Sequence, residues 1–436
     1  MTQSDILRVH EPLTVSTPTT RSNLILRNSS IDLLKRTSWN FFTGSQLTFG
    51  PNAVTSLTGI VRRFGSRRVF LVTGENLQDV GAVQRIEKAI GNTDAKLHVF
   101  TGGEREPSTD AVTRTAGFAH QFAPDLIVAL GGGSNMDLAK AVAAVIANDC
   151  TAESLVGFDQ VPRPSARLIC LPSTSGTGSE VSHSAILKSS TTGKKVAILS
   201  QHIRPAVAVV DPYMTISCPA KVTAASGIDA LTHAIEAYMA TNFFQFEEQS
   251  NGDLPYEGNN PFGDMYAEKA IQLVASHLHK AVHEPENLTA RSGMSLAATL
   301  AGFAFSNCGV GLCHALEYSI GSASDGCSHG AGNGIVLPEV IRFVADHRPD
   351  KMKKIATCIN PQFAALPADE AAGAAVEFIC ELRRSIDLPT SLASVGITEQ
   401  QLPDLARSAF GVKRLIDLTP GSPTEHDLLA ILKACL

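Results

Sequence analysis

Short β-branched runs alternate with helical patterns between Trp39 and about Val210, and this alternation constrains the fold more than any other feature. The runs predict strands at residues 68–73, 97–100, 126–130, 168–171 and 206–210. Apolar residues at helical spacing predict helices between them, at residues 52–64, 79–90, 109–122 and 135–148. A strand–helix–strand order of this kind predicts a mostly parallel, doubly wound sheet.

The second half of the chain has a different texture. After Asp211-Pro212 long Ala- and Leu-rich segments predict helices at residues 228–240, 265–283, 290–305 and 368–385. A chain of 436 residues is too long for one ordinary core. We therefore predict an N-terminal extension at 1–38, an α/β dinucleotide-binding domain at 39–212 and an all-α domain at 213–436.

Charge and cysteine usage narrow the function classes. The formal net charge is -6 and the Lys and Arg residues are scattered, which argues against nucleic acid or an anionic membrane as a partner. No apolar run reaches the about 18 residues that a membrane span needs. Nine cysteines without a CxxC pair indicate buried thiols in a reducing compartment, so we expect a cytoplasmic protein.

A glycine turn follows the most apolar predicted strand. Residues 126–130 run into Gly131-Gly132-Gly133-Ser134 and then into a predicted helix that carries Asp137. A strand, a glycine turn and a helix start place unpaired backbone N–H groups where a phosphate can bind. The alternative is an ordinary tight turn, because the glycines do not follow the GxGxxG spacing.

A second loop of small residues follows the predicted strand at 168–171. It reads Ser-Thr-Ser-Gly-Thr-Gly-Ser-Glu over residues 173–180. Glycines let a backbone approach a ligand closely and hydroxyl groups supply hydrogen bonds, although an ordinary turn uses the same residue types. The density of hydroxyls favours ligand binding.

One carboxylate and three imidazoles form a candidate metal site. Asp229 and His233 lie four residues apart on a predicted helix, which puts their Cβ atoms about 5–6 Å apart on one face. His314 lies on another predicted helix, and His329 lies in what we expect to be a glycine-rich loop. Such a set suits Fe(II) or Zn(II) and leaves room for a substrate oxygen.

Two structural readings compete with this catalytic metal site. Asp229 could be a capping residue and His233 a histidine of the core. A closed zinc site could instead use Cys313 and Cys327. Each of these cysteines neighbours a histidine on an element that would point the two side chains apart, which disfavours the closed site.

Four motifs stand in one order along the chain: Gly-Gly-Gly-Ser-x-x-Asp-x-Ala-Lys, Ser-Thr-Ser-Gly-Thr-Gly-Ser-Glu, Asp-Ala-Leu-Thr-His-Ala-Ile-Glu, and His-Ala-Leu-Glu-Tyr followed by Ser-His-Gly. Together they resemble the iron-dependent (group III) alcohol dehydrogenase family, from about Trp39 to the C-terminus. The resemblance implies an NAD(P)-dependent alcohol dehydrogenase or aldehyde reductase that binds iron, with zinc as the alternative, and forms a homodimer. Asp229, His233, His314 and His329 are the implied metal ligands.

The resemblance also implies a cofactor site. The residues that match its pyrophosphate-binding positions are Gly132, Gly133, Ser134 and Asp137, and those that match the rest of the site are Thr174, Thr177 and Lys195. Many members carry an Asp after the strand at 68–73, where it accepts from the ribose 2′-hydroxyl. This chain has Gly74 and Glu75 there, so the choice between NAD and NADP stays open.

Two further positions depart from the family pattern. Many members have a histidine with a proton-relay role four residues after the third metal ligand, where this chain has Tyr318. Its hydroxyl would pass a proton through water or the ribose, or the ring would simply pack in the wall. Residues 243–263 are longer and more acidic than the usual link, and we expect them to form a lid over the substrate.

The predicted reaction is hydride transfer between C4 of the nicotinamide and a small alcohol or aldehyde, with the metal lowering the pKa of the alcohol. Two alternatives stay open. A hydroxyacid–oxoacid transhydrogenase would keep its cofactor bound and pass hydride between two substrates. A metal-dependent lyase resembling dehydroquinate synthase would need basic residues for an acidic substrate, and His277, His279 and Lys280 are candidates.

Overall fold

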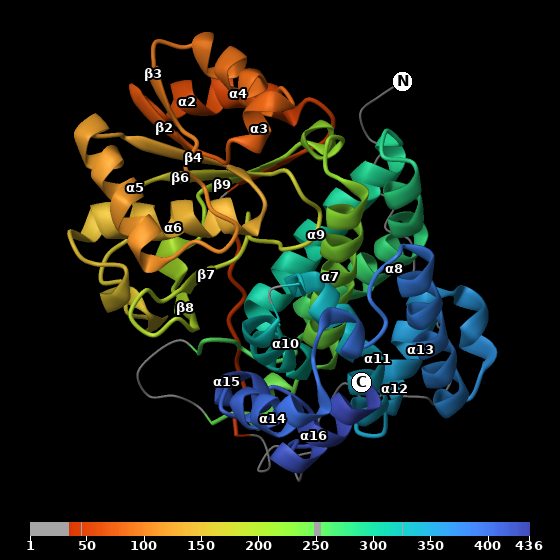
Figure 1. The fold of residues 1–436 in the computed structure, drawn as a ribbon. Helices are drawn as coiled ribbons and strands as arrows, with labels where there is room; N and C mark the ends of the chain where they lie inside the picture. The colour runs from red at the N-terminus through yellow and green to blue at the C-terminus, as the bar shows by residue number, and fades with distance from the viewer. Residues whose placement is uncertain (1–34, 45, 248–253, 325) are drawn as a thin grey trace, which may run out of the picture.

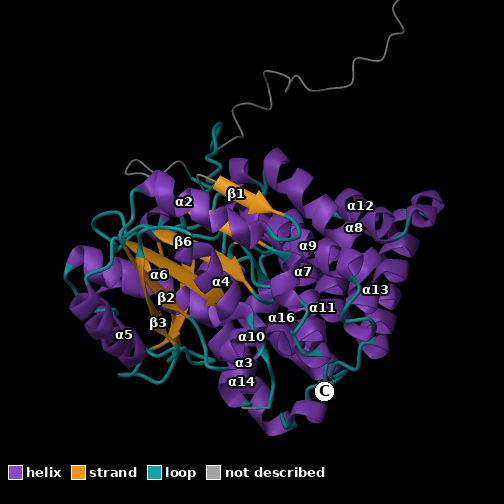
Figure 2. Ribbon diagram, turned by 90° about the horizontal axis from the view of Figure 1, so that it is seen from above, coloured by secondary structure: helices purple, strands orange, loops and turns teal. Residues whose placement is uncertain are grey.

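The computed structural model describes residues 35–436 except 45, 248–253 and 325. Figure 1 shows a sheet with its helices beside a second part built from helices, and Figure 2 shows the same division from above. The predicted fold class is therefore confirmed: a parallel α/β part is followed by a helical part. Most of the predicted N-terminal extension, residues 1–34, lies outside the described residues.

The main sheet is parallel throughout. Its strands are β1 (Gln46–Phe49), β2 (Arg68–Val72), β3 (Lys96–Phe100), β4 (Leu126–Gly131), β6 (Leu168–Pro172) and β9 (Val207–Val210), in the order β1-β9-β6-β4-β2-β3. From β2 the chain first adds β3 on one side and then β4 on the other. The carboxyl ends of β2 and β4 therefore border the point where the winding direction reverses, which is where open α/β sheets bind ligands.

Helices cover both faces of this sheet (Figure 1). They are α2 (Leu57–Phe64), α3 (Asn76–Asp79), α4 (Ala82–Gly91), α5 (Thr109–Phe122) and α6 (Gly133–Asn148). Side chains alternate along the strands, so Phe70 packs with the core beneath α5 and α6, while Val69 packs with the core beneath α2 and α4. The helix expected at residues 79–90 is divided, because Gly81 takes a left-handed conformation (φ 77°) between α3 and α4.

A second, smaller sheet was not expected from the sequence. It contains β5 (Gly157–Phe158), β7 (Ser184–Lys188) and β8 (Lys195–Leu199), in the order β5-β8-β7. β7 and β8 are antiparallel, and Gly193 (φ 70°) lies in the turn between them. These strands are short and only partly buried, so they lack the continuous apolar runs that identified the central strands.

Helices make up the C-terminal part: α7 (Ala220–Met239), α8 (Pro261–His283), α9 (Leu288–Cys308), α10 (Leu312–Ala323), α11 (His329–Ala345), α12 (Pro349–Ile359), α13 (Ala368–Ser385), α14 (Leu402–Phe410), α15 (Lys413–Ile416) and α16 (Glu425–Ala434). α7 lies in the centre and contacts α8, α9 and α11. Within the described chain no single helix is long and apolar enough to span a membrane, and the pair α9 and α10, which passes that test only jointly, is bent by 102°.

Candidate metal and cofactor site

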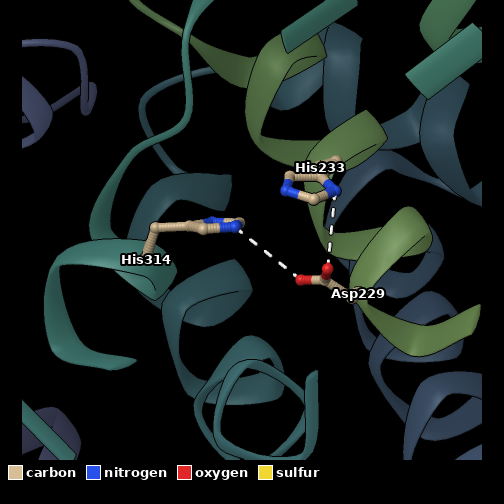
Figure 3. Close-up of side chains that lie close together, drawn as sticks. All are labelled: Asp229, His233 and His314. Carbon is tan, nitrogen blue, oxygen red and sulfur yellow. Dashed lines mark ion pairs between the residues drawn. The ribbon is translucent and has the colours of Figure 1, made fainter. Parts of the chain in front are cut away.

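The four candidate metal ligands converge from three helices. Asp229 and His233 lie on α7, His314 lies on α10, and Figure 3 shows the three side chains pointing toward one another. Their ligand atoms all lie within 4.8 Å of one another. His329 lies at the edge of this group, with Nε2 3.6 Å from Oδ1 of Asp229. It is the first residue of α11, so the expectation of a loop was wrong: the glycines after it are helical.

Two buried glutamates hold the rings of the histidines. Oε2 of Glu236 lies 2.5 Å from Nδ1 of His314, and Oε2 of Glu317 contacts Nδ1 of His329. A carboxylate on one ring nitrogen fixes the tautomer and leaves the other nitrogen free to bind a metal. Our sequence reasoning missed both roles, although both glutamates stand in the motifs that contain His233 and His314.

Asn333 is a third residue that the sequence reasoning missed. It is fully buried on α11, one helical turn after His329. Its Nδ2 lies 2.8 Å from Oδ1 of Asp229, 3.2 Å from Nε2 of His314 and 3.4 Å from Nε2 of His329. The i, i+4 spacing from His329 was the available signal, because it places both side chains on one face of a helix.

The donor set fits a divalent metal ion. Nδ1 of His233 is buried without a hydrogen-bond partner, which is costly unless something binds the site. Burial lowers the pKa of His233 to about 4, so its imidazole is neutral at physiological pH, as a metal ligand must be. Burial raises the pKa of Asp229, but its histidine neighbours outweigh this and leave the pKa below its usual value. The site therefore offers an ionised carboxylate and a neutral imidazole.

A cavity opens beside these ligands, between the two parts of the chain. Its lining includes all four candidate ligands together with the apolar side chains Phe305 and Val310 and the phenols of Tyr256 and Tyr318. Phe305 stacks on the ring of His233, with the centroids 4.3 Å apart. Tyr256 belongs to the segment 243–263 that we expected to form a lid; residues 248–253 of that segment lie outside the described residues.

The two small-residue loops lie against each other at the sheet end of the cavity. A Cβ on Gly133 would come within 2.9 Å of Thr177, and one on Gly132 within 3.4 Å of Thr174. Gly133 is the first residue of α6, so the unpaired N–H groups of that helix start face this position. Gly133, Ser134 and Thr177 line the cavity. A glycine is therefore required sterically at residue 133.

Asp137 and Lys195 are already engaged by other groups. One carboxylate oxygen of Asp137 accepts from Ser179 Oγ at 2.6 Å, and the other accepts from the backbone N–H of Ile186 at 3.0 Å. Asp137 thus fixes the second loop and the strand β7 beside the cavity. Nζ of Lys195 lies 3.3 Å from Glu317, the glutamate that contacts His329, and so links the small sheet to the metal group.

Gly74 and Glu75 follow β2 at the edge of the main sheet. A Cβ on Gly74 would lie 3.5 Å from Nδ2 of Asn135 in α6, so the end of β2 and the first glycine turn are neighbours. Glu75 is exposed, and neither residue lines the cavity itself. The pair lies beside the cavity rather than within it.

The glycines of the second loop also pack the two parts of the chain together. A Cβ on Gly176 would collide with the backbone of Ser226 in α7 at 2.4 Å, and one on Gly178 with Gly302 in α9 at 2.5 Å. The packing reading of these glycines is therefore correct, and it holds together with the approach of Thr177 to the first loop.

The residues that the competing readings need lie elsewhere. His277, His279 and Lys280 are on α8 and none of them lines the cavity, which removes the basic residues invoked for a lyase. Cys313 and Cys327 are free thiols and do not join the group of metal-binding atoms found in the described residues. The closed zinc site is therefore not formed.

Comparison with known proteins gives consistent matches along the chain. Residues 44–212 match the family model for iron-containing alcohol dehydrogenase, and residues 254–436 match the model for the C-terminal part of the Fe-containing alcohol dehydrogenase family. Long-chain-alcohol dehydrogenase 1 of Geobacillus thermodenitrificans is 32% identical, over 88% of this chain and 93% of the relative. The mitochondrial hydroxyacid-oxoacid transhydrogenase of Homo sapiens is 30% identical, over 90% and 88%.

Solved structures agree. A crystal structure of 1,3-propanediol oxidoreductase superposes with a TM-score of 0.85 at 29% identity and covers 92% of this chain and 100% of that chain. Sulfoacetaldehyde reductase from Bifidobacterium kashiwanohense, in complex with NAD+, superposes with a TM-score of 0.79 at 28% identity, over 92% and 99%. The whole two-part architecture is therefore shared with these proteins.

Proposed function

Because the chain belongs to the iron-containing alcohol dehydrogenase family, we propose that it transfers a hydride between NAD or NADP and a small alcohol or aldehyde at a metal held by Asp229, His233, His314 and His329. The convergence of these side chains from three helices around the unpartnered Nδ1 of His233 carries the proposal. Fe(II) is the ion that the family indicates, and Zn(II) accepts the same ligands.

Each group has a task in this reaction. A bound divalent ion supplies Lewis acidity, which lowers the pKa of an alcohol and polarises a carbonyl. Glu236 and Glu317 keep the rings of His314 and His329 oriented. Burial raises the pKa of the Tyr318 phenol, so this group stays protonated at neutral pH and acts as a hydrogen-bond donor in the cavity.

The cofactor binds at the reversal point of the sheet. A nicotinamide cofactor supplies or accepts the hydride. Its pyrophosphate is received by the start of α6, at Gly132, Gly133 and Ser134, where the helix end carries a partial positive charge. Thr174 and Thr177 complete this cradle, while Asp137 and Lys195 hold its surroundings in place. Gly74 and Glu75 lie where the ribose of NAD or the 2′-phosphate of NADP would be distinguished.

Metal content and cofactor oxidation test the proposal together. Anaerobically purified protein is subjected to elemental analysis and is then assayed with a panel of small aldehydes, with NADH and with NADPH. We expect stoichiometric iron or zinc and oxidation of at least one cofactor. The His233→Ala protein should lose both metal and activity, whereas the control His279→Ala, on an exposed residue outside the cavity, should keep both. Full metal retention in the His233→Ala protein would contradict the assignment.

A transhydrogenase is the second candidate function, because a relative of that name is 30% identical over 90% of this chain. Such an enzyme keeps its cofactor bound and exchanges hydride between two substrates. Sustained oxidation of free NADH or NADPH by a single aldehyde supports the dehydrogenase. Hydride exchange that needs a second substrate and no free cofactor supports the transhydrogenase.

The assembly and the location of the protein belong to the same proposal. We place the domain boundary after residue 212 and propose a homodimer in the cytoplasm. The edge strand β1 exposes Leu47 and Phe49, and an exposed apolar sheet edge favours self-association. The free thiols of the described chain suit a reducing compartment. Sedimentation of the protein against a Leu47→Lys/Phe49→Lys variant tests the dimer.

A further inference from the structure

A cationic side chain without a counter-charge lies behind the wall of the cavity. Arg414 belongs to α15, which packs against α10, the helix of His314 and Tyr318. Its Nε is buried without a hydrogen-bond partner, and its guanidinium forms no ion pair with a carboxylate of the described residues. Guanidinium groups in such positions are normally paired, because an unpaired buried charge is costly.

Two phenols lie between this cation and the cavity. The guanidinium carbon of Arg414 lies 5.9 Å from the centroid of the Tyr318 ring. Hydrogen bonding and charge from Arg414 act against the effect of burial on both Tyr256 and Tyr318, which places the guanidinium beside both phenol groups. Both tyrosines line the cavity, on the side of the helical part.

This arrangement is directional. A phenol oxygen that accepts from a guanidinium N–H becomes a better donor through its own O–H, because linked hydrogen bonds polarise one another. Arg414 therefore strengthens two O–H donors that can point into the cavity, and no carboxylate of the described residues neutralises it. An anionic group would accept both hydrogen bonds and supply the missing negative charge.

We propose that the substrate carries a carboxylate or similar anion at the end away from its reacting carbon, and that Tyr256 and Tyr318, supported by Arg414, receive it. The inference rests on the proposed function, because it places the reacting carbon at the metal ligands. The centroids of the Tyr318 and His329 rings are 6.4 Å apart, so the anion and the reacting carbon belong to one short molecule. The other cavity walls near the metal group, Phe305 and Val310, are apolar and suit the carbon chain between them.

Paired aldehydes measure the preference. Succinic semialdehyde and butanal have the same number of carbons and differ in a carboxylate against a methyl group. We expect a higher kcat/KM for the acid. In the Arg414→Met protein the ratio of the two values should fall roughly 10- to 100-fold, as expected when a hydrogen bond to a charged group is lost. Arg414→Lys should restore part of the ratio, because it keeps the charge.

Lys413→Met is the matched control. It removes the neighbouring cation of the same short helix, an exposed side chain whose Nζ lies over the ring of Phe410. The ratio should stay within about twofold of the parent value, because an exposed charge outside the cavity contributes little. Equal ratios in the parent protein and the Arg414→Met protein would overturn the inference, as would an equal fall in the Lys413→Met protein.

A binding measurement separates this inference from the proposed function. Butyrate does not react, and its binding to the holoprotein can be measured by calorimetry without catalysis. We expect butyrate to bind the parent and Lys413→Met proteins more tightly than the Arg414→Met protein. If no aldehyde is reduced but butyrate binding depends on Arg414, the proposed function fails and the anion site stands. If aldehydes are reduced but butyrate binding ignores Arg414, the anion site fails alone.

Discussion

The glutamate behind His314 offers a sharp test of the metal site. Glu236 accepts two hydrogen bonds, from Nδ1 of His314 at 2.5 Å and from the backbone N–H of Cys313 at 2.6 Å. Glu236→Gln keeps the shape but leaves only one accepting oxygen. Either the amide N–H group opposes another donor, or His314 changes tautomer and places its proton on Nε2, the nitrogen that faces Asp229.

The size of the effect follows from these contacts. A hydrogen bond to a charged group is worth about 1.5–3 kcal/mol, and one of the two is lost. Loss of a carboxylate partner of a metal-binding histidine weakens metal affinity about 10- to 100-fold, which corresponds to about 1.4–2.8 kcal/mol. We therefore expect the affinity of the Glu236→Gln protein for Zn(II) to fall within this range.

Competition with a chromophoric chelator measures the affinity directly, with Zn(II) as the probe ion. Glu268→Gln is the matched control, because Glu268 accepts from Tyr238 at 3.1 Å on α8 and does not line the cavity. Circular dichroism verifies that both variants are folded. An affinity within about twofold of the parent in the Glu236→Gln protein, or an equal loss in the control, would refute the positioning role.

Three further predictions concern cofactor binding, stability and pH. Gly133→Ala should weaken NADH binding, because its Cβ would lie 2.9 Å from Thr177, and adding Thr177→Ser should restore part of the affinity measured by fluorescence titration. Arg36→Met should lower the unfolding free energy by about 3–5 kcal/mol, because it leaves the carboxylate of Glu257 buried without its cation; adding Glu257→Gln should recover part of this in urea denaturation. Burial lowers the pKa of His183 to about 3, so the unfolded chain takes up this proton first as pH falls and stability is lost between about pH 6.5 and 3. His183→Asn should remove up to about 1.4 kcal/mol per pH unit of that dependence; an unchanged slope would show that His183 does not contribute.

The central strands could be predicted because they are buried on both faces. β4 is buried along its whole length, so it reads as a continuous apolar run, and the helix after it begins at a glycine. β7 and β8 escaped prediction because half-exposed, short strands carry no such run. The helical start at His329 escaped for another reason: glycines disfavour helix in isolation, and tertiary packing overrides this preference in α11.

Local sequence thus determined the chemistry available at the site, since residue types and spacings of three, four and seven follow directly from the chain. The pairing of Asp229 with His233 needs only one helix. The contacts from Glu236 to His314, from Glu317 to His329 and from Arg414 to the two phenols join different elements, and only the tertiary structure could decide them. The physical reason is that spacing fixes distances within a helix, whereas contacts between helices depend on how their buried faces pack.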